Sequence, residues 1–528
     1  MKNQETLQIS PANKEAEISK LFERANYQVM TGDWESARQQ FLDILKIDAT
    51  HLNSLISFAV LLVEMGYNSA AKTAYLQAIK HHPNSMLAHI NLGNLYFLER
   101  QFENAKYHYQ TAINISLTQK IDASQVSMLG NEENSNLAQL PHLADLAQAH
   151  QGLALIYFEE GNKELADLHH YKGYTLEPIR LFPSRTDVVP PEHLKISSKS
   201  NFKPKSLLVL IGGRGGDVPW RTFVDSKHFS TQTLAVEYFK NEVQVLDLPD
   251  HDLIFNAIGD ADSSTQSLIA ALELLKAQPT PYPRPLLNHP EAVLRTGRLS
   301  NAKRFNKIQG VRAPRTYLLN RLQLRELEVL EKLLLTEITF PVVLRSLGFQ
   351  TGKHFEYAET FQDLVNLCGQ LPGDDLLVME FLNAKDSNGF YRKFRVMCID
   401  GQLYPVHLAL STQWKVHYFS AAMKDSPENR SIEATFLIDM PQFIGENALL
   451  ALKTISHELA LDYAGIDFGL SECGEVLFFE ANSTMVLANP PADPVWDYRR
   501  GPIQRARDAA IQMLINKAGL KNAGLKND

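Results

Sequence analysis

The sequence predicts a multidomain protein with an all-α solenoid of helical hairpins, then an α/β subdomain, then an α+β domain. Small residues recur at a fixed spacing in the first third of the chain, and a stretch rich in proline and serine follows. Short apolar runs then alternate with helical patterns. In a chain of 528 residues we place the solenoid at 15–180, a linker at 181–204, the α/β subdomain at 205–300 and the α+β domain at 301–520.

The composition is that of a globular protein, with 45% hydrophobic and 21% charged residues. The net charge of −8 favours neither nucleic acid nor a membrane as a partner, and we expect neither. The three cysteines, Cys368, Cys398 and Cys473, form no C-x-x-C pair, so neither a disulfide framework nor a thiolate zinc site is expected. The first residues lack a signal-peptide pattern and no apolar run has the length of a membrane span, so we predict a cytoplasmic protein.

Three sets of positions in the first part of the chain repeat with a period of 34 residues. They are Ala25, Ala59 and Gly93; Ala37, Ala71 and Ala105; and Phe41, Tyr75 and Tyr109. Small residues let two antiparallel helices approach closely, while the aromatic residues fill the space between hairpins. The frame returns with Ala154 and Ala166 after an irregular polar insertion at about 116–141. This pattern resembles the tetratricopeptide repeat (TPR), in four copies with the insertion before the fourth.

The resemblance implies that the concave side of the solenoid binds a peptide or another protein. The alternative is that the helices serve only for assembly, as in a homodimer. The insertion is a candidate lid over a catalytic cleft. We assign structural roles to His81, His82, His169 and His170, because adjacent histidines do not share one helix face.

Beyond the linker, apolar runs at 206–211, 243–246 and 253–258, with a helical pattern at 264–277, predict a parallel α/β unit. The glycines at 212–216 do not form a dinucleotide-binding fingerprint, because Pro219 and Trp220 stand where a helix should begin. We interpret them as a loop. Strand pairs are then expected at 340–357, 394–410 and 463–480.

The hairpin at 463–480 carries the strongest chemical signal. If its turn is centred near Cys473 and Gly474, Asp467 lies directly across from Glu480, and Asn482 shares their face of the sheet. Two opposed carboxylates repel each other unless a cation or a partner neutralises them. Oxygen ligands of this kind suit a Mg²⁺ ion that keeps some waters and bridges nucleotide phosphates. The alternative is a pair of ordinary polar residues on a solvated sheet face.

The hairpin at 340–357 is a candidate phosphate cover, since a strand that ends in Arg345 precedes a loop rich in Gly, Ser and Thr. The loop is not a Walker A motif. Gly348 and Gly352 are one residue too close together, and His354 replaces the Ser or Thr of that motif. The alternative is a structural turn.

These two hairpins, separated by segments 376–382 and 391–396, resemble the ATP-grasp family of carboxylate–amine ligases. The similarity is nearest to its D-alanine–D-alanine ligase, glutathione synthetase and ribosomal-protein-modifying glutamate ligase branches, and it covers roughly 205–518. It implies that 205–300 is a pre-ATP-grasp subdomain and 301–520 an ATP-grasp fold. It also implies ATP, one or two Mg²⁺ ions, an acyl phosphate that an amine attacks, and a small-molecule amine or carboxylate as a substrate.

The resemblance implies roles for individual residues. Asp467, Glu480 and Asn482 correspond to the magnesium ligands, and Arg395 to the arginine that steadies the transferring phosphate. The residues that would bind ATP include Gly348, Thr351, Gly352 and Lys353 of the loop and the hinge residues Glu380, Phe381 and Leu382. Arg345 would contact phosphate in place of the usual lysine, together with either Arg298 or Lys303. His407 and His417 are candidates for substrate binding or general base catalysis, with packing roles as the alternative.

The expected function is therefore formation of an amide or peptide bond on a peptide or protein that the TPR-like part holds. Two alternatives stay open: a ligase that makes a small metabolite, with the repeat used for assembly, and an inactive scaffold that binds nucleotide. The intact Asp467, Glu480 and Asn482 favour an enzyme, whereas Arg345 in place of lysine keeps the scaffold open.

Overall fold

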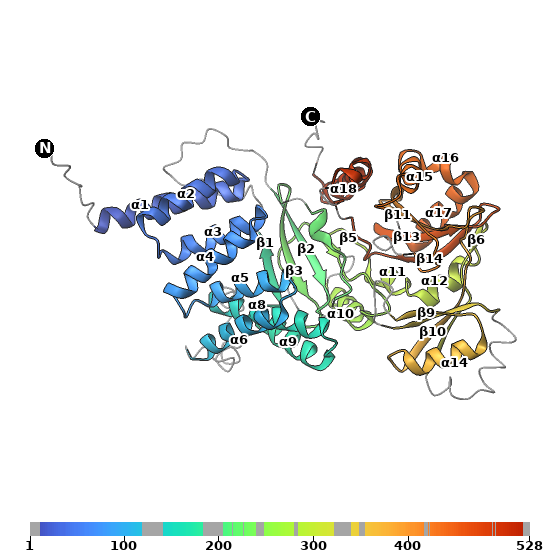
Figure 1. Cartoon of the computed structure of the whole chain (residues 1–528), viewed down its shortest axis with the longest axis horizontal. Coiled ribbons are helices and arrows are strands. Elements are labelled where there is room, and N and C mark those ends of the chain that lie inside the picture. The colour runs from blue at the N-terminus through green and yellow to red at the C-terminus, as the bar shows by residue number, and fades with distance from the viewer. Residues whose placement is uncertain are drawn as a thin grey trace. The chain divides into compact units, whose positions relative to one another are not determined.

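The computed structural model describes residues 11–118, 141–182, 204–213, 215–224, 226–238, 248–278, 284–320, 339–347, 354–416, 421, 423–487, 489–490 and 493–520. The chain forms two compact units: Met1–Pro204 with Ser226–Lys240, and Lys205–Asp225 with Asn241–Asp528. The first is mainly helical and the second combines helices with mixed sheets, which confirms the predicted fold class (Figure 1). No stretch of helix within the described ranges has both the length and the hydropathy of a membrane span.

The first unit contains an array of helical hairpins. The helices are α1 (Pro11–Thr31), α2 (Trp34–Ile47), α3 (Leu52–Glu64), α4 (Asn68–His81), α5 (Met86–Leu98), α6 (Phe102–Thr118), α8 (Pro141–Glu159) and α9 (Lys163–Leu176). The hairpin partners are α1 and α2, α3 and α4, α5 and α6, and α8 and α9. Successive hairpins also pack on one another, as α2 does on α3 and α4 on α5. Most of the insertion, residues 119–140, lies outside the described ranges.

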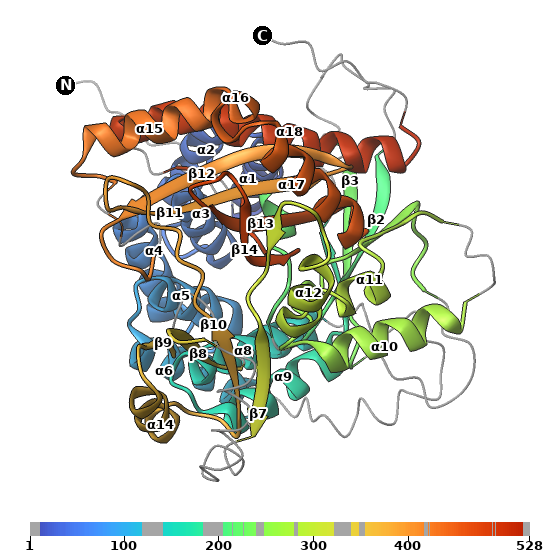
Figure 2. The same cartoon turned by 90° about the vertical axis from the view of Figure 1, so that its right-hand side faces the viewer.

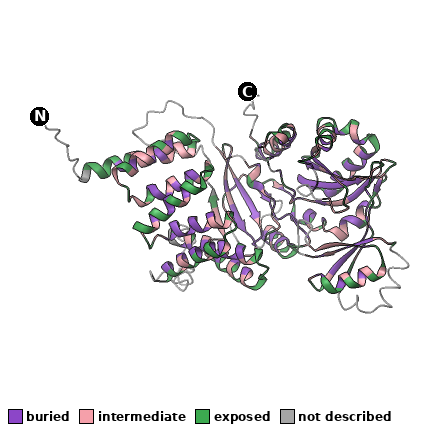
Figure 3. Ribbon diagram, viewed as in Figure 1, coloured by how far each residue is buried: buried purple, intermediate pink, exposed green. Residues whose placement is uncertain are grey.

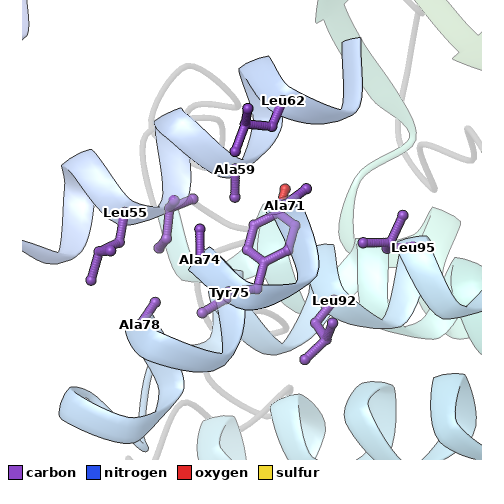
Figure 4. Close-up of a cluster of buried hydrophobic side chains, with 11 residues drawn as sticks. Leu55, Ala59, Leu62, Ala71, Ala74, Tyr75, Ala78, Leu92 and Leu95 are labelled. Carbon is purple, nitrogen blue, oxygen red and sulfur yellow. The ribbon is translucent and has the colours of Figure 1, made fainter. Parts of the chain in front are cut away.

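The residues that recur every 34 positions form the core of this array. Ala59, Ala71 and Tyr75 meet between α3 and α4, and Leu92 of α5 joins the same cluster (Figure 4). The period requires glycine at one place, since a Cβ on Gly93 would lie 2.9 Å from Cε1 of Tyr109. The sequence repeat is therefore a repeat of helix packing.

Two strands complete the first unit. β1 (Ile179–Phe182) pairs antiparallel with β3 (Phe229–Ala235), with Ile179 opposite Leu234. The ring of Tyr238, just past β3, stacks on Tyr174 of α9 at 5.2 Å between centroids. The end of β1 thus falls within the range that we assign to the linker, and β3 within the range that we assign to the α/β subdomain.

The second unit begins with a parallel sheet of β2 (Lys205–Ile211), β4 (Leu253–Asn256) and β5 (Leu286–Leu287). Helices α10 (Thr265–Lys276), α11 (Pro290–Leu294) and α12 (Arg298–Phe305) follow these strands. Trp220 begins a single 3-10 turn, Trp220–Thr222, rather than the helix that a dinucleotide loop requires. The run expected as a strand at 243–246 lies outside the described residues.

Two further sheets follow, one antiparallel and one mixed. One sheet has the order β7 (Thr316–Asn320), β10 (Asp375–Glu380), β8 (Val342–Ser346) and β9 (Phe355–Ala358), with α14 (Phe361–Gln370) packed on β8 and β9. The other has the order β12 (Gln402–Ser411), β11 (Tyr391–Ile399), β13 (Tyr463–Leu470), β14 (Val476–Asn482) and β6 (Val311–Arg312). It is mixed, since its strands β14 and β6 pair parallel. The central strands of this second sheet are largely buried (Figure 3).

Helices cover this last sheet. They are α15 (Pro427–Ile438), α16 (Met440–Ile444), α17 (Glu446–Leu459) and α18 (Asp497–Lys517), with a 3-10 turn at Pro494–Trp496. α15 and α18 pack on β12, and α18 also on β11 (Figure 2).

Candidate active site

A cavity of about 580 Å³ lies within the second unit, a size typical of small-molecule sites. Its walls come from β8 and β10 of one sheet, from β11–β14 of the other, and from α18.

A row of polar side chains crosses one wall of this cavity. Glu480 of β14 is opposite Asp467 of β13, Asp467 is opposite Arg395 of β11, and Arg395 is opposite His407 of β12. Residues directly opposite one another point to the same face of a sheet, and all four side chains line the cavity. We call this set the polar row. It includes the Asp467–Glu480 opposition expected from the hairpin count.

Asp467 is neutralised within the protein. Its side chain is 1% exposed, and its carboxylate accepts from Nε and Nη2 of Arg395 at 2.6 and 2.8 Å and from Nζ of Lys393 at 2.7 Å. Burial alone would raise the pKa of Asp467, but Arg395 and Lys393 hold that pKa well below its ordinary value. Lys393 is a residue that our sequence analysis did not single out. The signal was present, since 393 and 395 lie on one face of a strand.

Glu480 is neutralised by Arg298. One guanidinium nitrogen of Arg298 donates to Oδ2 of Asp262 at 2.6 Å, and another donates to Oε1 of Glu480. Burial alone would lower the pKa of Arg298, but Glu480 and Asp262 raise it. Lys303, the alternative to Arg298, is exposed on α12 and does not line the cavity.

The donor set fits a magnesium ion in part. Glu480 and Asn482 line the cavity together, with Nδ2 of Asn482 donating to Oε1 of Glu480 at 3.0 Å, and both carry the hard oxygen atoms that Mg²⁺ prefers. Oδ1 of Asn482 accepts from the N–H and the hydroxyl of Thr484 at 3.0 and 2.9 Å, so it would have to exchange these bonds for a metal. Asp467 does not fit as a ligand here, because Arg395 and Lys393 engage both of its oxygens. Within the described ranges, no three residues among His, Cys, Asp and Glu are grouped as a metal site. The cations that neutralise the carboxylates are side chains.

The opposite wall of the cavity is aromatic and apolar. Trp414 lies 5.4 Å from Phe355 and 6.1 Å from Phe381, between ring centroids, and Val343 and Met379 pack beside them. Such a surface suits a flat heteroaromatic ring. The expected hinge residues Glu380, Phe381 and Leu382 all line the cavity.

The hinge backbone is already engaged in part. The N–H of Glu380 donates to the carbonyl of Arg315, and that of Phe381 to the carbonyl of Pro341. The Glu380 carboxylate is paired with Arg312 at 2.5 Å. A bound base would therefore meet other groups of this hinge.

The remaining predicted residues divide into two groups. Arg345 and His407 line the cavity. Burial, and then the neighbouring Arg298, lower the pKa of Arg345, while burial and the charge of Arg395 hold the pKa of His407 well below its usual value. The residues that lie outside the described ranges are Gly348, Thr351, Gly352, Lys353 and His417.

Neither a protein-family model nor a curated protein matches the chain. Solved structures do show similarity. The VanG D-Ala:D-Ser ligase from Enterococcus faecalis is 14% identical with a TM-score of 0.39, over 60% of this chain and 100% of that one. The ATP-grasp ligase PsnB, solved with precursor peptide PsnA2 and AMPPNP, is 13% identical with a TM-score of 0.35, over 60% and 99%.

MamA from Desulfovibrio magneticus is 17% identical with a TM-score of 0.24, over 31% of this chain and 78% of that one. These scores are too low to carry an argument.

Proposed function

We propose that the second unit is an ATP- and Mg²⁺-dependent, ADP-forming carboxylate–amine ligase of the ATP-grasp type. The polar row carries this proposal, because it lines up two carboxylates, an arginine and a histidine along a cavity that has an aromatic wall. ATP would lie with its base against Phe355, Phe381 and Trp414 and its phosphates toward Arg298 and Arg345.

The first chemical step is phosphoryl transfer. A substrate carboxylate beside Arg395 attacks the γ-phosphorus, the bond from phosphorus to the β-phosphate oxygen breaks, and ADP leaves with the electron pair. This reaction depends on positioning and on neutralisation of charge, which Arg298, Arg345 and Arg395 supply. Glu480 and Asn482 would hold a magnesium ion, which would supply further neutralisation of phosphate charge.

The second step forms the amide. An amine nitrogen attacks the acyl carbon, the C–O bond to the phosphate breaks, and phosphate leaves with those electrons and with the proton that the nitrogen loses. Arg395 stabilises the negative charge of the tetrahedral intermediate. We include His407 in the substrate end of the site, because it follows Arg395 in the polar row.

The proposal also covers the role of the first unit and the cellular location of the protein. The helical array would bind the peptide or protein that is modified, and we keep the predicted domain boundaries as part of the proposal. A reducing, cytoplasmic location accords with three free cysteines, of which Cys368 and Cys398 are buried and Cys473 is exposed. A ligase for a small metabolite, with the array used for assembly, is the second candidate.

Calorimetry on the full chain tests nucleotide binding. We expect AMPPNP to bind in the presence of Mg²⁺ and to bind at least about tenfold more weakly in EDTA, since the metal neutralises phosphate charge. Arg298→Lys, which keeps a charge but cannot bridge Asp262 and Glu480, should also weaken binding. Lys303→Met on the same helix is the matched control and should bind as wild type. Equal affinity with and without EDTA would refute the metal assignment.

A further inference from the structure

One end of the cavity is not used by the nucleotide in the proposed function. It lies where α18 packs on β12, the edge strand that carries His407. Two residues of α18, Arg499 and Ile503, contribute to the cavity wall there. We call this end of the cavity the α18 subsite.

Arg499 is a buried cation with a fixed orientation. It is 8% exposed. Its Nε lies 3.4 Å from Oε1 of Glu433, and its Nη2 donates to the carbonyl of Val406 at 3.4 Å. A guanidinium held in this way keeps its planar fork in one place, which lowers the entropy lost when it binds a carboxylate.

The partner of Arg499 is itself fixed. Glu433 of α15 is fully buried. Its carboxylate accepts from the N–H of Leu408 at 3.2 Å and from the hydroxyl of Tyr498 at 2.5 Å. Through these contacts Glu433 holds Arg499 beside β12. The side chain of Arg499 also lines the cavity.

The position of Arg499 relative to the reaction follows from the sheet register. Arg395 is opposite His407, and Val406, the next residue of β12, accepts the bond from Arg499. Adjacent strands are about 4.8 Å apart, so Arg499 contacts the strand next to the one that carries Arg395. It lies on the side away from β13 and β14, where Asp467 and Glu480 are.

Beside its polar contacts with Glu433 and Val406, Arg499 shares the cavity wall with apolar residues. Ile503 lies one helical turn after it, on the same face of α18. Met485 and Leu487, from the segment after β14, line the same cavity and are almost completely buried. A buried cation beside an aliphatic wall matches a ligand that carries a carboxylate next to an apolar side chain.

We propose that the α18 subsite binds the amine substrate, and that this substrate carries a carboxylate and an apolar side chain. The inference rests on the proposed ligase function and names its substrate class. The carboxylate pairs with Arg499, the side chain packs on Ile503 and Leu487, and the amine points toward Arg395. A free amino acid and a short peptide with a free C-terminus share this chemistry.

Calorimetry with leucine and leucinamide on the full chain tests the inference, with and without AMPPNP and Mg²⁺. The two probes have the same side chain and differ at the carboxyl group, which is a carboxylate in leucine and an uncharged amide in leucinamide. We expect leucine to bind at least about tenfold more tightly, as for other hydrogen bonds between charged groups. Serine should bind more weakly than leucine. Alanyl-leucine distinguishes the two sources, since tighter binding of this dipeptide than of leucine indicates a peptide substrate.

The variant that removes Arg499 must not leave Glu433 unpaired in the interior. We therefore combine Arg499→Met with Glu433→Gln. This variant should lose the preference for leucine over leucinamide and keep its affinity for AMPPNP. Arg505→Met, an exposed arginine of the same helix, is the matched control and should keep both.

A second variant tests the apolar wall without touching a charge. Ile503→Ala enlarges the subsite, so the preference should shift from leucine toward phenylalanine. Equal binding of leucine and leucinamide by the wild-type chain overturns the inference, whatever AMPPNP does. A chain that prefers leucine but does not bind AMPPNP supports the subsite and refutes the proposed ligase.

Discussion

Asp467 shows how a single residue can be understood wrongly when its neighbours are unknown. Considered with Glu480 alone, it is one of two carboxylates that repel each other. In the structure it is also the partner of Arg395 and Lys393, in a position with 1% of its side chain exposed. The balance of charge at Asp467 is therefore attractive, and its negative charge supports the fold.

The substitution Asp467→Asn tests this balance. If repulsion between Asp467 and Glu480 were the main effect, the substitution would leave the stability of the protein unchanged or raise it. Considered from the structure, it leaves two partly buried cations, Arg395 and Lys393, without their counter-charge and should lower the free energy of unfolding by about 1–3 kcal/mol. ADP formation should be lost as well. Denaturation in urea measures the stability, and Glu472→Gln, on the exposed turn of the same hairpin, should be close to neutral. A stability equal to wild type would contradict the pairing.

The same site shows which part of the chemistry the sequence can supply. Counting across one tight turn places Asp467 opposite Glu480, as the structure does, but the register shifts by one residue between Asp467 and Phe468, and the count contains no sign of that irregularity. The pairing of Asp467 with Arg395 joins strands that are 72 residues apart. No local count brings those two together, and Arg499 of the α18 subsite depends on a helix that packs on the sheet edge. Contacts between residues that are distant in the chain are therefore the part of this site that the sequence does not predict.

At the scale of elements, two helical hairpins each contain a pair of histidines. Nδ1 of His89 in α5 lies 2.9 Å from Nδ1 of His108 in α6, and the same distance separates His150 of α8 from His169 of α9. Both pairs are 19 residues apart in the chain. Such a contact requires at least one neutral ring, because two imidazolium rings have no acceptor. His169 lies within α9, and its structural role stays a prediction.

These pairs predict acid-sensitive stability. Burial lowers the pKa of His108, His150 and His169 to about 4, and it also lowers that of His89. Their unfolded pKa is about 6.5, so the unfolded chain binds more protons between these values and stability falls as the pH falls from about 6.5 toward 4. Between pH 7 and pH 5 we expect a loss of about 1–2 kcal/mol for each histidine whose pKa falls to about 4, and so about 2–4 kcal/mol for His150 and His169 together.

Urea denaturation at the two pH values measures this loss. The variant His89→Gln with His108→Gln should lose less than wild type between pH 7 and pH 5. His81→Gln, at an exposed position of α4, should lose as much as wild type. If the double variant and wild type respond equally to pH, the pairs do not govern the acid response.

The elements were predictable to different degrees. The helices of the array follow from small and aromatic residues at a period of 34, because each repeat makes the same local contacts. The pairing of β1 with β3 was not predicted, since Ile179 and Leu234 are far apart in the chain and each strand is short. A strand of four residues carries too few alternations to show its partner.

At the scale of the whole molecule, this strand pair defines how the chain divides. β1 precedes residues 183–203 and β3 follows them, yet both belong to the first compact unit. A boundary placed between them in the sequence therefore does not separate two independent structures. Tyr238 stacked on Tyr174 adds a contact of the same kind.

Limited proteolysis checks this division. The stretch between Phe182 and Pro204 is rich in proline and serine, and we expect cleavage there. Because β1 and β3 stay paired, the two pieces should elute together under native conditions and separate only in denaturant. Pieces that separate on a native sizing column would show that the β1–β3 pair does not hold them.

The role of the helical array is tested by deleting it while keeping β1. A fragment that begins at Pro178 retains β1 beside β3, whereas one that begins at Lys205 leaves an edge of β3 unpaired and should aggregate. If the array binds the substrate, the Pro178 fragment should keep kcat on small substrates and show a KM raised at least about tenfold for the peptide substrate, because uniform binding energy appears in KM. If the array serves assembly, light scattering should show a lower mass and KM should not change. If KM is unchanged and light scattering shows that the dimer is lost, the repeats do not bind the substrate. Their function is then assembly.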